Sequence, residues 1–365
     1  MRLLPCLALF ACSLGPVELE EAPLLFPPDW ALDAPGDYRV GFTTWVHDYE
    51  VPVGVSPRSV PINVWYPTLE NSGESGAYLQ GLYEDPLVVL DAAPAPAWRV
   101  EGLPVLVFSH GDTSWGAASA DLMRFFASHG WVAIAPDHTD NTLLRTVEPR
   151  PTAHYIHRPL DISATLNALR DSNLAVLNES DTESVLMSGH SFGAYTSWSS
   201  AGALYSEEAL VEACPTLEEG QCSQEELDFF LSGQLHDPRI GAIITMAGAI
   251  RRNFFGENGH LGVEVPVMLM SGSEDGNGIP NSWVDLQDLD TLSWLELVGG
   301  CHESFAMGVC STLDPELGFS LVNAYSLALG RSAILGDASS EVEALLSGEW
   351  VLSDKARYSV SSGSK

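Results

Sequence analysis

Near its middle the chain runs Ser184-Val185-Leu186-Met187-Ser188-Gly189-His190-Ser191-Phe192-Gly193, and this segment indicates how it folds. Its first five residues are small or apolar, as in a strand that is buried on both faces of a sheet. Residues 192–204, which follow, are predicted to form a helix. The turn between strand and helix matches G-x-S-x-G, the pattern of a nucleophile elbow. Ser191 is therefore the candidate nucleophile.

Short apolar runs and helical segments alternate on both sides of this motif. Strands are predicted at 103–108, 131–135, 240–246, 265–270 and 293–298, and helices at 117–129, 160–177 and 316–330. Such alternation predicts a mostly parallel sheet with helices on both faces. Residues 38–51 and 59–66 are predicted to form an antiparallel N-terminal strand pair. Residues 67–102 are polar and punctuated by Gly and Pro, and no strand is predicted there. The predicted fold class is α/β.

One catalytic domain is expected over residues 37–335, preceded by a loose lead-in at 15–36. Within it, residues 205–237 interrupt the alternation of strands and helices. They are acidic and are predicted to be an insertion. Residues 336–365 are small and polar, and they are predicted to be a tail with at most one short helix near 342–346.

A serine hydroxyl is a poor nucleophile unless a base takes its proton. In this arrangement of strands the partners follow the serine in the order acid, then histidine. His302 lies just past the last predicted strand and is the candidate base. The acid is expected on the loop after residues 265–270, where Glu274 and Asp275 are both available. Asp275 is favoured because it lies three residues after Gly272.

The loop after the first buried strand, Ser109-His110-Gly111-Asp112, is placed to stabilise an oxyanion. Backbone N–H groups do this work, and we assign those of Asp112 and Phe192. Trp115 is predicted either to form a wall of the acyl pocket or to be a core aromatic at the start of a helix. His110 is predicted to be a structural hydrogen-bonding residue.

Residues 154–161 contain two histidines, but their spacing does not predict a metal site. An ion pair between Arg158 and Asp161 at a helix start is predicted instead. No metal and no cofactor is expected.

The charge balance excludes one class of partner. The chain has 16 Lys+Arg against 49 Asp+Glu, a formal net charge of −33. Such a surface repels nucleic acids and anionic bilayers. No nucleic-acid partner is therefore expected.

The first residues resemble an export signal. Arg2 gives a positive start, and Leu3 to Leu14 form an apolar run that is too short to span a bilayer. Residues 1–14 are predicted to be a signal peptide of a secreted or periplasmic protein. Residues 9–12 also loosely match a lipoprotein cleavage site, so anchoring through a lipid on Cys12 is the alternative.

Four cysteines lie beyond the leader, and an even number in an exported protein predicts disulfides. Four cysteines allow three pairings. Pairing between near neighbours is the simplest of these, and it joins Cys214 to Cys222 and Cys301 to Cys310. A disulfide at Cys301 would hold the loop that carries His302.

Several blocks of the sequence resemble one branch of the α/β-hydrolases, that of platelet-activating-factor acetylhydrolases and dienelactone-hydrolase-like enzymes. They are residues 107–111, 126–138, 189–193 and the pattern Arg158-Pro159-x-Asp161, within a resemblance that covers roughly 37–332. The resemblance implies a serine esterase that acts on short-chain or phospholipid-type esters. Bacterial polyester hydrolases and cutinases share the fold, the serine order and a disulfide near the catalytic histidine.

One departure from the vertebrate plasma enzymes of this branch weakens the transfer of phospholipid specificity. In those enzymes the acid follows the strand just after the nucleophile helix, but here residues 245–249 contain no carboxylate. The acid therefore falls to Asp275, as in the polyester hydrolases. We predict an exported serine carboxylic-ester hydrolase that works through an acyl-enzyme. The alternatives are a polyester hydrolase or cutinase-like esterase, an acyltransferase with the same triad, and a non-catalytic binding protein.

Overall fold

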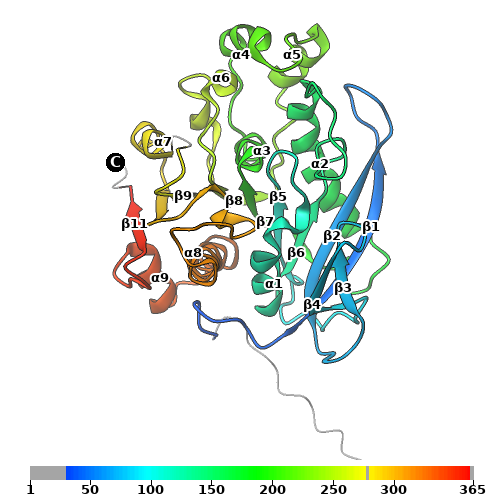
Figure 1. Cartoon of the computed structure of the whole chain (residues 1–365), viewed down its shortest axis with the longest axis vertical. Helices are drawn as coiled ribbons and strands as arrows, with labels where there is room; N and C mark the ends of the chain where they lie inside the picture. Colours follow the sequence, from blue (N-terminus) through cyan, green and yellow to red (C-terminus); the bar gives the residue numbers. More distant parts are fainter. Residues whose placement is uncertain (1–29, 277–278, 362–365) are drawn as a thin grey trace, which may run out of the picture.

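A computed structural model describes residues 30–276 and 279–361 (Figure 1). The predicted leader, including Cys12, and most of the lead-in lie outside these residues. The described strands form one eleven-stranded sheet, in the order β11-β10-β9-β8-β7-β5-β6-β2-β1-β4-β3. The strands are β1 Arg39–Tyr49, β2 Arg58–Thr68, β3 Ser75–Tyr78, β4 Tyr83–Leu90, β5 Pro104–Ser109, β6 Val132–Pro136, β7 Asp181–His190, β8 Ile240–Met246, β9 Val267–Gly272, β10 Leu292–Leu297 and β11 Ala356–Val360.

The six strands from β10 to β6 are parallel and form the centre of the sheet. Every residue of β5, β6 and β9 is buried, which explains why each of these strands is a continuous apolar run in the sequence. The six central strands lie where they were predicted. The N-terminal pair is also confirmed, because β1 and β2 are antiparallel over their whole length.

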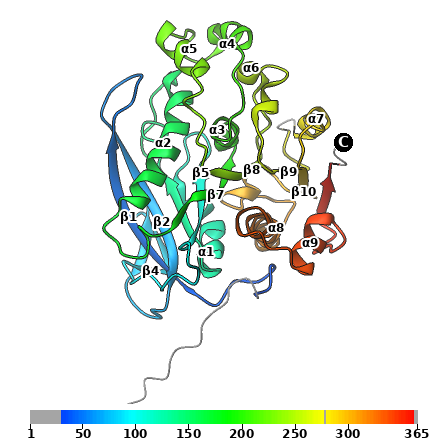
Figure 2. The same cartoon turned by 180° about the vertical axis from the view of Figure 1, so that it is seen from behind.

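Helices cover both faces of the sheet, and Figures 1 and 2 show α2, α3 and α6 on one face and α1, α8 and α9 on the other. A separate hydrophobic cluster lies under each layer. The α-helices are α1 Ala120–Ser128, α2 Ala153–Arg170, α3 Phe192–Ser200, α4 Glu207–Ala213, α5 Gln224–Leu231, α6 Arg252–Phe255, α7 Ile279–Asp285, α8 Pro315–Leu335 and α9 Ser340–Ser347. The 3-10 turns are η2 Gly116–Ser119, η3 Cys214–Thr216, η4 Gly259–Gly262 and η5 His302–Phe305.

Helix α2 runs from Ala153 to Arg170, so both of its ends lie seven residues before those of the predicted helix at 160–177. Pro159 lies inside this helix, although a proline cannot donate the helical hydrogen bond to the carbonyl four residues earlier. In the structure that carbonyl, on Tyr155, accepts a hydrogen bond from the Tyr195 hydroxyl at 2.8 Å. A side chain of α3 thus replaces the missing backbone donor, and the helix continues through the proline.

The expectations for two segments, 67–102 and 336–365, need correction. Residues 67–102 contain two strands, β3 and β4, and β4 pairs in parallel with β1. The predicted polar tail contains α9 and a strand, β11, that pairs antiparallel with β10. The sheet therefore extends past residue 335. These strands lie at or near the sheet edges and are partly exposed, so they lack the continuous apolar pattern of the centre.

The segment 205–237 lies between α3 and β8 and contains α4, η3 and α5, at the end of the molecule farthest from α9 in Figure 1. Cys214 and Cys222 form a disulfide within it, as predicted. Of the helices that the structure describes, none has the length and hydropathy needed to cross a bilayer.

Candidate active site

Ser191 stands at the turn between β7 and α3, with φ 54° and ψ −110°. A non-glycine residue rarely adopts a positive φ, and such strain is concentrated at functional sites. The two glycines of the motif allow the close packing around the turn. A Cβ on Gly189 would lie 2.1 Å from the Gly193 carbonyl oxygen, and a Cβ on Gly193 would lie 1.9 Å from that of Ser109. The elbow predicted from the sequence is present.

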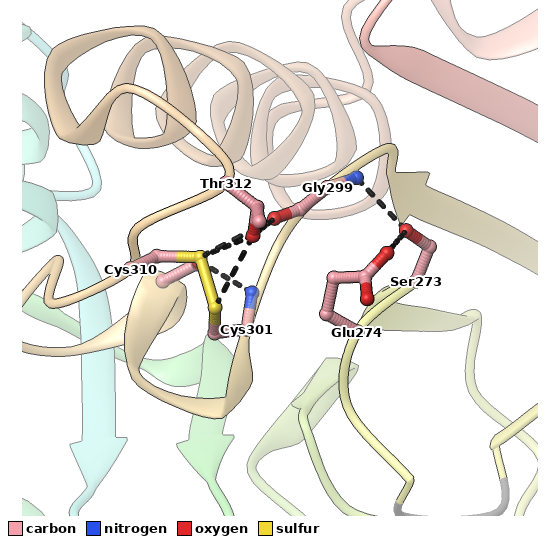
Figure 3. Close-up of a disulfide and its surroundings, with 7 residues drawn as sticks. Ser273, Glu274, Gly299, Cys301, Cys310 and Thr312 are labelled. Carbon is pink, nitrogen blue, oxygen red and sulfur yellow. Dashed lines mark hydrogen bonds between the residues drawn. A yellow bond between two sulfur atoms is a disulfide. The ribbon is translucent and has the colours of Figure 1, made fainter.

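His302 and Asp275 form a hydrogen-bonded pair at the carboxyl ends of the central strands, where Ser191 also lies. The distance from His302 Nδ1 to Asp275 Oδ2 is 3.0 Å. Asp275 follows β9 and His302 follows β10, so both side chains lie past the carboxyl ends of parallel strands. Glu274, the alternative acid, is exposed and accepts a hydrogen bond from the Ser273 hydroxyl (Figure 3). The structure thus pairs Asp275, and not Glu274, with the candidate base.

The two loops that carry this pair are packed against each other. A Cβ on Gly272 would lie 2.1 Å from the carbonyl oxygen of Gly300, so the loops touch backbone to backbone. Across this contact the Glu274 N–H donates to the Gly300 carbonyl at 2.9 Å. The Gly299 N–H also donates to the Ser273 hydroxyl at 2.8 Å. Backbone contacts thereby fix the separation of the acid and the base.

The residue before His302 is tied into a disulfide. Figure 3 shows Cys301 joined to Cys310 beside Thr312, and this is the predicted pairing. The Thr312 hydroxyl donates to the Gly299 carbonyl at 2.6 Å. On the other side of His302, the turn η5 ends at Phe305, which is buried and whose carbonyl accepts from Ser119 at 3.1 Å. His302 is therefore held from both ends.

The surroundings set the protonation of two neighbouring histidines. The hydrogen bond to Asp275 raises the pKa of His302. His190, between Gly189 and Ser191, has its ring centre 4.8 Å from that of His302. Burial, and then the charge of His302, lower the pKa of His190 to about 4. A neutral His190 donates from Nε2 to the carbonyl oxygen of His302 at 3.0 Å, which places the candidate base next to the elbow.

The loop after β5 lies against the nucleophile. A Cβ on Gly111 would lie 3.4 Å from the Cβ of Ser191. Among the residues that the structure describes, no hydrogen-bond acceptor is found for the backbone N–H of Asp112 or of Phe192. The Asp112 carboxylate accepts from Asn141 Nδ2 at 2.8 Å and pairs with Arg150 at 2.8 Å. Arg150 thus neutralises the negative charge of Asp112, which would otherwise destabilise an oxyanion nearby.

A buried polar network supports this loop from below. The Ser109 hydroxyl donates to His138 Nε2 at 2.9 Å, and His138 Nδ1 donates to Asp161 at 2.9 Å. Arg58 completes the network with an ion pair to Asp161 at 2.7 Å. Burial would raise the pKa of Asp161, but Arg58 holds it well below its usual range. Burial lowers the pKa of His138 to about 3, so its ring is neutral.

The predicted ion pair between Arg158 and Asp161 was wrong. Asp161 pairs with Arg58, which is far away in the sequence and so could not be identified from spacing. Arg158 instead donates to the Asn141 amide oxygen at 2.6 Å and to the carbonyl of His110. As predicted, His110 is a structural residue. Its Nε2 accepts from the His138 N–H at 2.9 Å, and its Nδ1 donates to the Gly111 carbonyl at 2.7 Å.

Trp115 lies at the start of η2, half-buried against the hydrophobic cluster under α1 and α8. It lines a cavity of about 850 Å³ together with Asn63, Asp137 and Leu144, and the residues that line this cavity do not include Ser191. This position fits a core aromatic at a helix start. The acyl-pocket role stays a prediction.

Three residues at the site were not singled out from the sequence: Asn141, Arg150 and His190. Asn141 and Arg150 lie in the long loop between β6 and α2 and reach the site through Asp112. Nothing in their local sequence marks them. His190 occupies a variable position of the G-x-S-x-G motif and is the last residue of the buried strand β7, which was the only available signal.

Comparisons with known proteins agree with this fold. A family model described as Chlorophyllase matches residues 86–213, which include β5, β6, β7 and the elbow. A search of curated proteins finds no match. Among solved structures, a ferulic acid esterase from Streptomyces cinnamoneus is similar, with a TM-score of 0.61 and 19% identity, over 89% of this chain and 98% of that chain. The chain has the α/β-hydrolase fold.

Proposed function

We propose that this chain is an exported serine carboxylic-ester hydrolase. The observation that carries the proposal is the strained Ser191 elbow beside a histidine that is hydrogen-bonded to Asp275. Fold alone does not fix function, so the argument rests on this arrangement of side chains. The Chlorophyllase family model and the ferulic acid esterase support an ester as the substrate. Two disulfides are consistent with an oxidising, extracellular location.

In the proposed mechanism, His302 takes the proton of Ser191 as its oxygen attacks the ester carbonyl. Asp275 holds the imidazole in the tautomer with a proton on Nδ1 and stabilises the imidazolium that forms. The N–H groups of Asp112 and Phe192 stabilise the negative oxygen of the tetrahedral intermediate. His302 then protonates the departing alcohol. Water, activated by the same histidine, hydrolyses the acyl-enzyme and restores Ser191.

Hydrolysis of 4-nitrophenyl esters from acetate to palmitate tests the activity. We expect turnover that Ser191→Ala lowers by a factor on the order of 10⁶ in kcat. Ser232→Ala, an exposed serine at the end of α5, serves as the control. An active Ser191→Ala protein would reject the assignment. Transfer of the acyl group to an added alcohol, in preference to water, would identify an acyltransferase instead.

The same series tests the expected preference for short acyl chains. The insertion at 205–237 holds two short helices and carries acidic residues in the first turn of each. It offers no long apolar helix of the kind that opens over a lipid interface. We therefore expect acetate or butyrate esters to be hydrolysed faster than palmitate esters. Faster turnover of palmitate, measured below its aggregation limit, would contradict this.

A further inference from the structure

Three arginines, Arg150, Arg158 and Arg251, lie over the ring of Phe192, the residue directly after Ser191. The guanidinium carbon of Arg150 is 5.1 Å from the centre of this ring, and that of Arg251 is 5.5 Å from it. Arg150 comes from the loop between β6 and α2, and Arg251 from the loop after β8. Phe192 and Arg158 are buried, whereas Arg150 and Arg251 are partly buried, so the guanidinium groups of these two form part of the cover over the ring. Both of these arginines come from loops that follow the carboxyl ends of parallel strands, as Ser191 does.

The two partly buried arginines, Arg150 and Arg251, differ in their partners. Arg150 pairs with the carboxylates of Asp112 and Glu218. Arg251 has no carboxylate within ion-pair distance among the residues of 30–276 and 279–361. Every other arginine in that part of the chain forms an ion pair, apart from the exposed Arg39 and the buried Arg158.

The lack of a carboxylate partner for Arg251 among the described residues is unexpected, because carboxylates are abundant in the chain, with 49 Asp+Glu against 16 Lys+Arg. Partial burial removes part of the hydration of a cation, and this costs free energy unless a counter-ion compensates for it. We therefore expect the counter-ion of Arg251 to come from a bound molecule.

The backbone around Arg251 is fixed relative to the nucleophile. A Cβ on Gly248, in the same loop, would lie 2.7 Å from the carbonyl oxygen of Ser191 and 2.6 Å from the Cβ of Ala194. The loop thus passes directly against the elbow. At its other end, the carbonyl of Arg251 accepts from the Phe254 N–H at 2.9 Å at the start of α6. The guanidinium group is presented from an anchored backbone and not from a free loop.

We propose that Arg251 binds an anionic group, a carboxylate or a phosphate, carried by the ester that Ser191 attacks. The proposal rests on the proposed function and names its substrate class. A guanidinium group presents a planar fork of N–H donors that matches both oxyanions, and contact with an aromatic face orients it. The net charge of −33 repels anions at long range, so recognition depends on this local cation.

Matched pairs of esters test the proposal. 4-Acetoxybenzoate and its methyl ester place the charge on the alcohol side, and mono(4-nitrophenyl) adipate and its methyl ester place it on the acyl side. 4-Acetoxyphenyl phosphate and its dimethyl ester replace the carboxylate by a phosphate. For at least one pair, we expect Arg251→Ala to lower the ratio of kcat/KM for the anionic over the neutral ester by about tenfold or more, as for the loss of a charged hydrogen-bond partner.

Arg252→Ala is the control, because Arg252 is the next residue and pairs with Glu257 and Asp285. It should leave the ratio unchanged. Arg251→Gln, which retains most of the side chain's length, replaces Arg251→Ala if that protein does not fold. A larger loss for the phosphate pair than for the carboxylate pairs would identify phosphate as the ligand.

The outcomes separate this proposal from the esterase assignment. Hydrolysis of the neutral esters, with a ratio that Arg251 substitutions do not change in any pair, overturns the anion site and leaves the esterase standing. Absence of hydrolysis of every ester by the unaltered protein overturns the proposed function, and the anion site with it.

Discussion

The hydrogen bond between Asp275 and His302 determines how the candidate base titrates. It raises the pKa of His302 above its ordinary value of 6.5. The base works only when it is neutral, so kcat/KM should fall as the pH drops through this raised pKa. The acid limb of the pH profile should therefore lie above pH 6.5.

Asp275→Asn tests this residue directly. We expect kcat to fall by a factor of roughly 10⁴, because the amide favours the wrong imidazole tautomer. Loss of the negative charge should also move the acid limb to lower pH. Glu274→Gln is the matched control, since Glu274 is the adjacent carboxylate and contacts Ser273 instead. Reversed effects of the two substitutions in a pH-rate experiment would show that the acid is misassigned.

The turn η5 and the disulfide beside it position the base. Cys301 precedes His302, and its disulfide to Cys310 closes a loop of short sequence separation. Closing such a loop can contribute roughly 2–3 kcal/mol by restricting the unfolded chain. A displacement of about 1 Å at a reacting group can cost about 100-fold in rate. The disulfide is therefore expected to affect both stability and catalysis.

The double variant Cys301→Ser/Cys310→Ser should have a lower Tm and a lower kcat than the unaltered protein. The control is Cys214→Ser/Cys222→Ser, which removes a disulfide of similar separation from the insertion. It should lower Tm with a smaller effect on kcat. Thermal unfolding and 4-nitrophenyl butyrate kinetics check both variants. Equal losses of kcat would show that the disulfide beside His302 has no special role in positioning it.

The molecule as a whole is a central parallel sheet extended at both edges. Strand β11 covers the edge of β10, and its Tyr358 ring lies 4.8 Å from that of Tyr325 on α8. Beside it, the Val298 N–H donates to the Lys355 carbonyl at 2.8 Å. These contacts make the C-terminal segment part of the domain, because an uncovered strand edge invites pairing with other chains.

Ending the chain after Gly348 should lower Tm by several degrees and promote aggregation, because the truncation removes β11 and exposes the edge of β10. Ending it after Ser361 is the control, since that chain keeps β11. Differential scanning calorimetry and light scattering measure the two effects. Equal Tm values for the two truncated proteins would mean that β11 contributes nothing to the fold.

How much could be predicted depended on burial. The central strands are largely buried, so their apolar runs could be recognised. Ser191, Asp275 and His302 were singled out as candidates because each follows such a strand. Strands β3, β4 and β11 are partly exposed and were missed. Contacts between distant residues, such as Arg58 with Asp161, carry no local signal. Helix α2 was predicted seven residues too far along the chain. Its start before Pro159 depends on the Tyr195 hydroxyl, which lies on another helix and gives no local signal.

The central claim is that Ser191 is the nucleophile that becomes acylated. Reaction with diethyl 4-nitrophenyl phosphate, followed by mass spectrometry of the digested protein, tests it most directly. We predict one diethylphosphoryl group per chain, located on Ser191, and a loss of esterase activity in proportion to labelling. Asp275→Asn should react much more slowly, because the base is misoriented. A label on another residue, or full activity in a protein that is fully labelled at Ser191, would contradict the assignment.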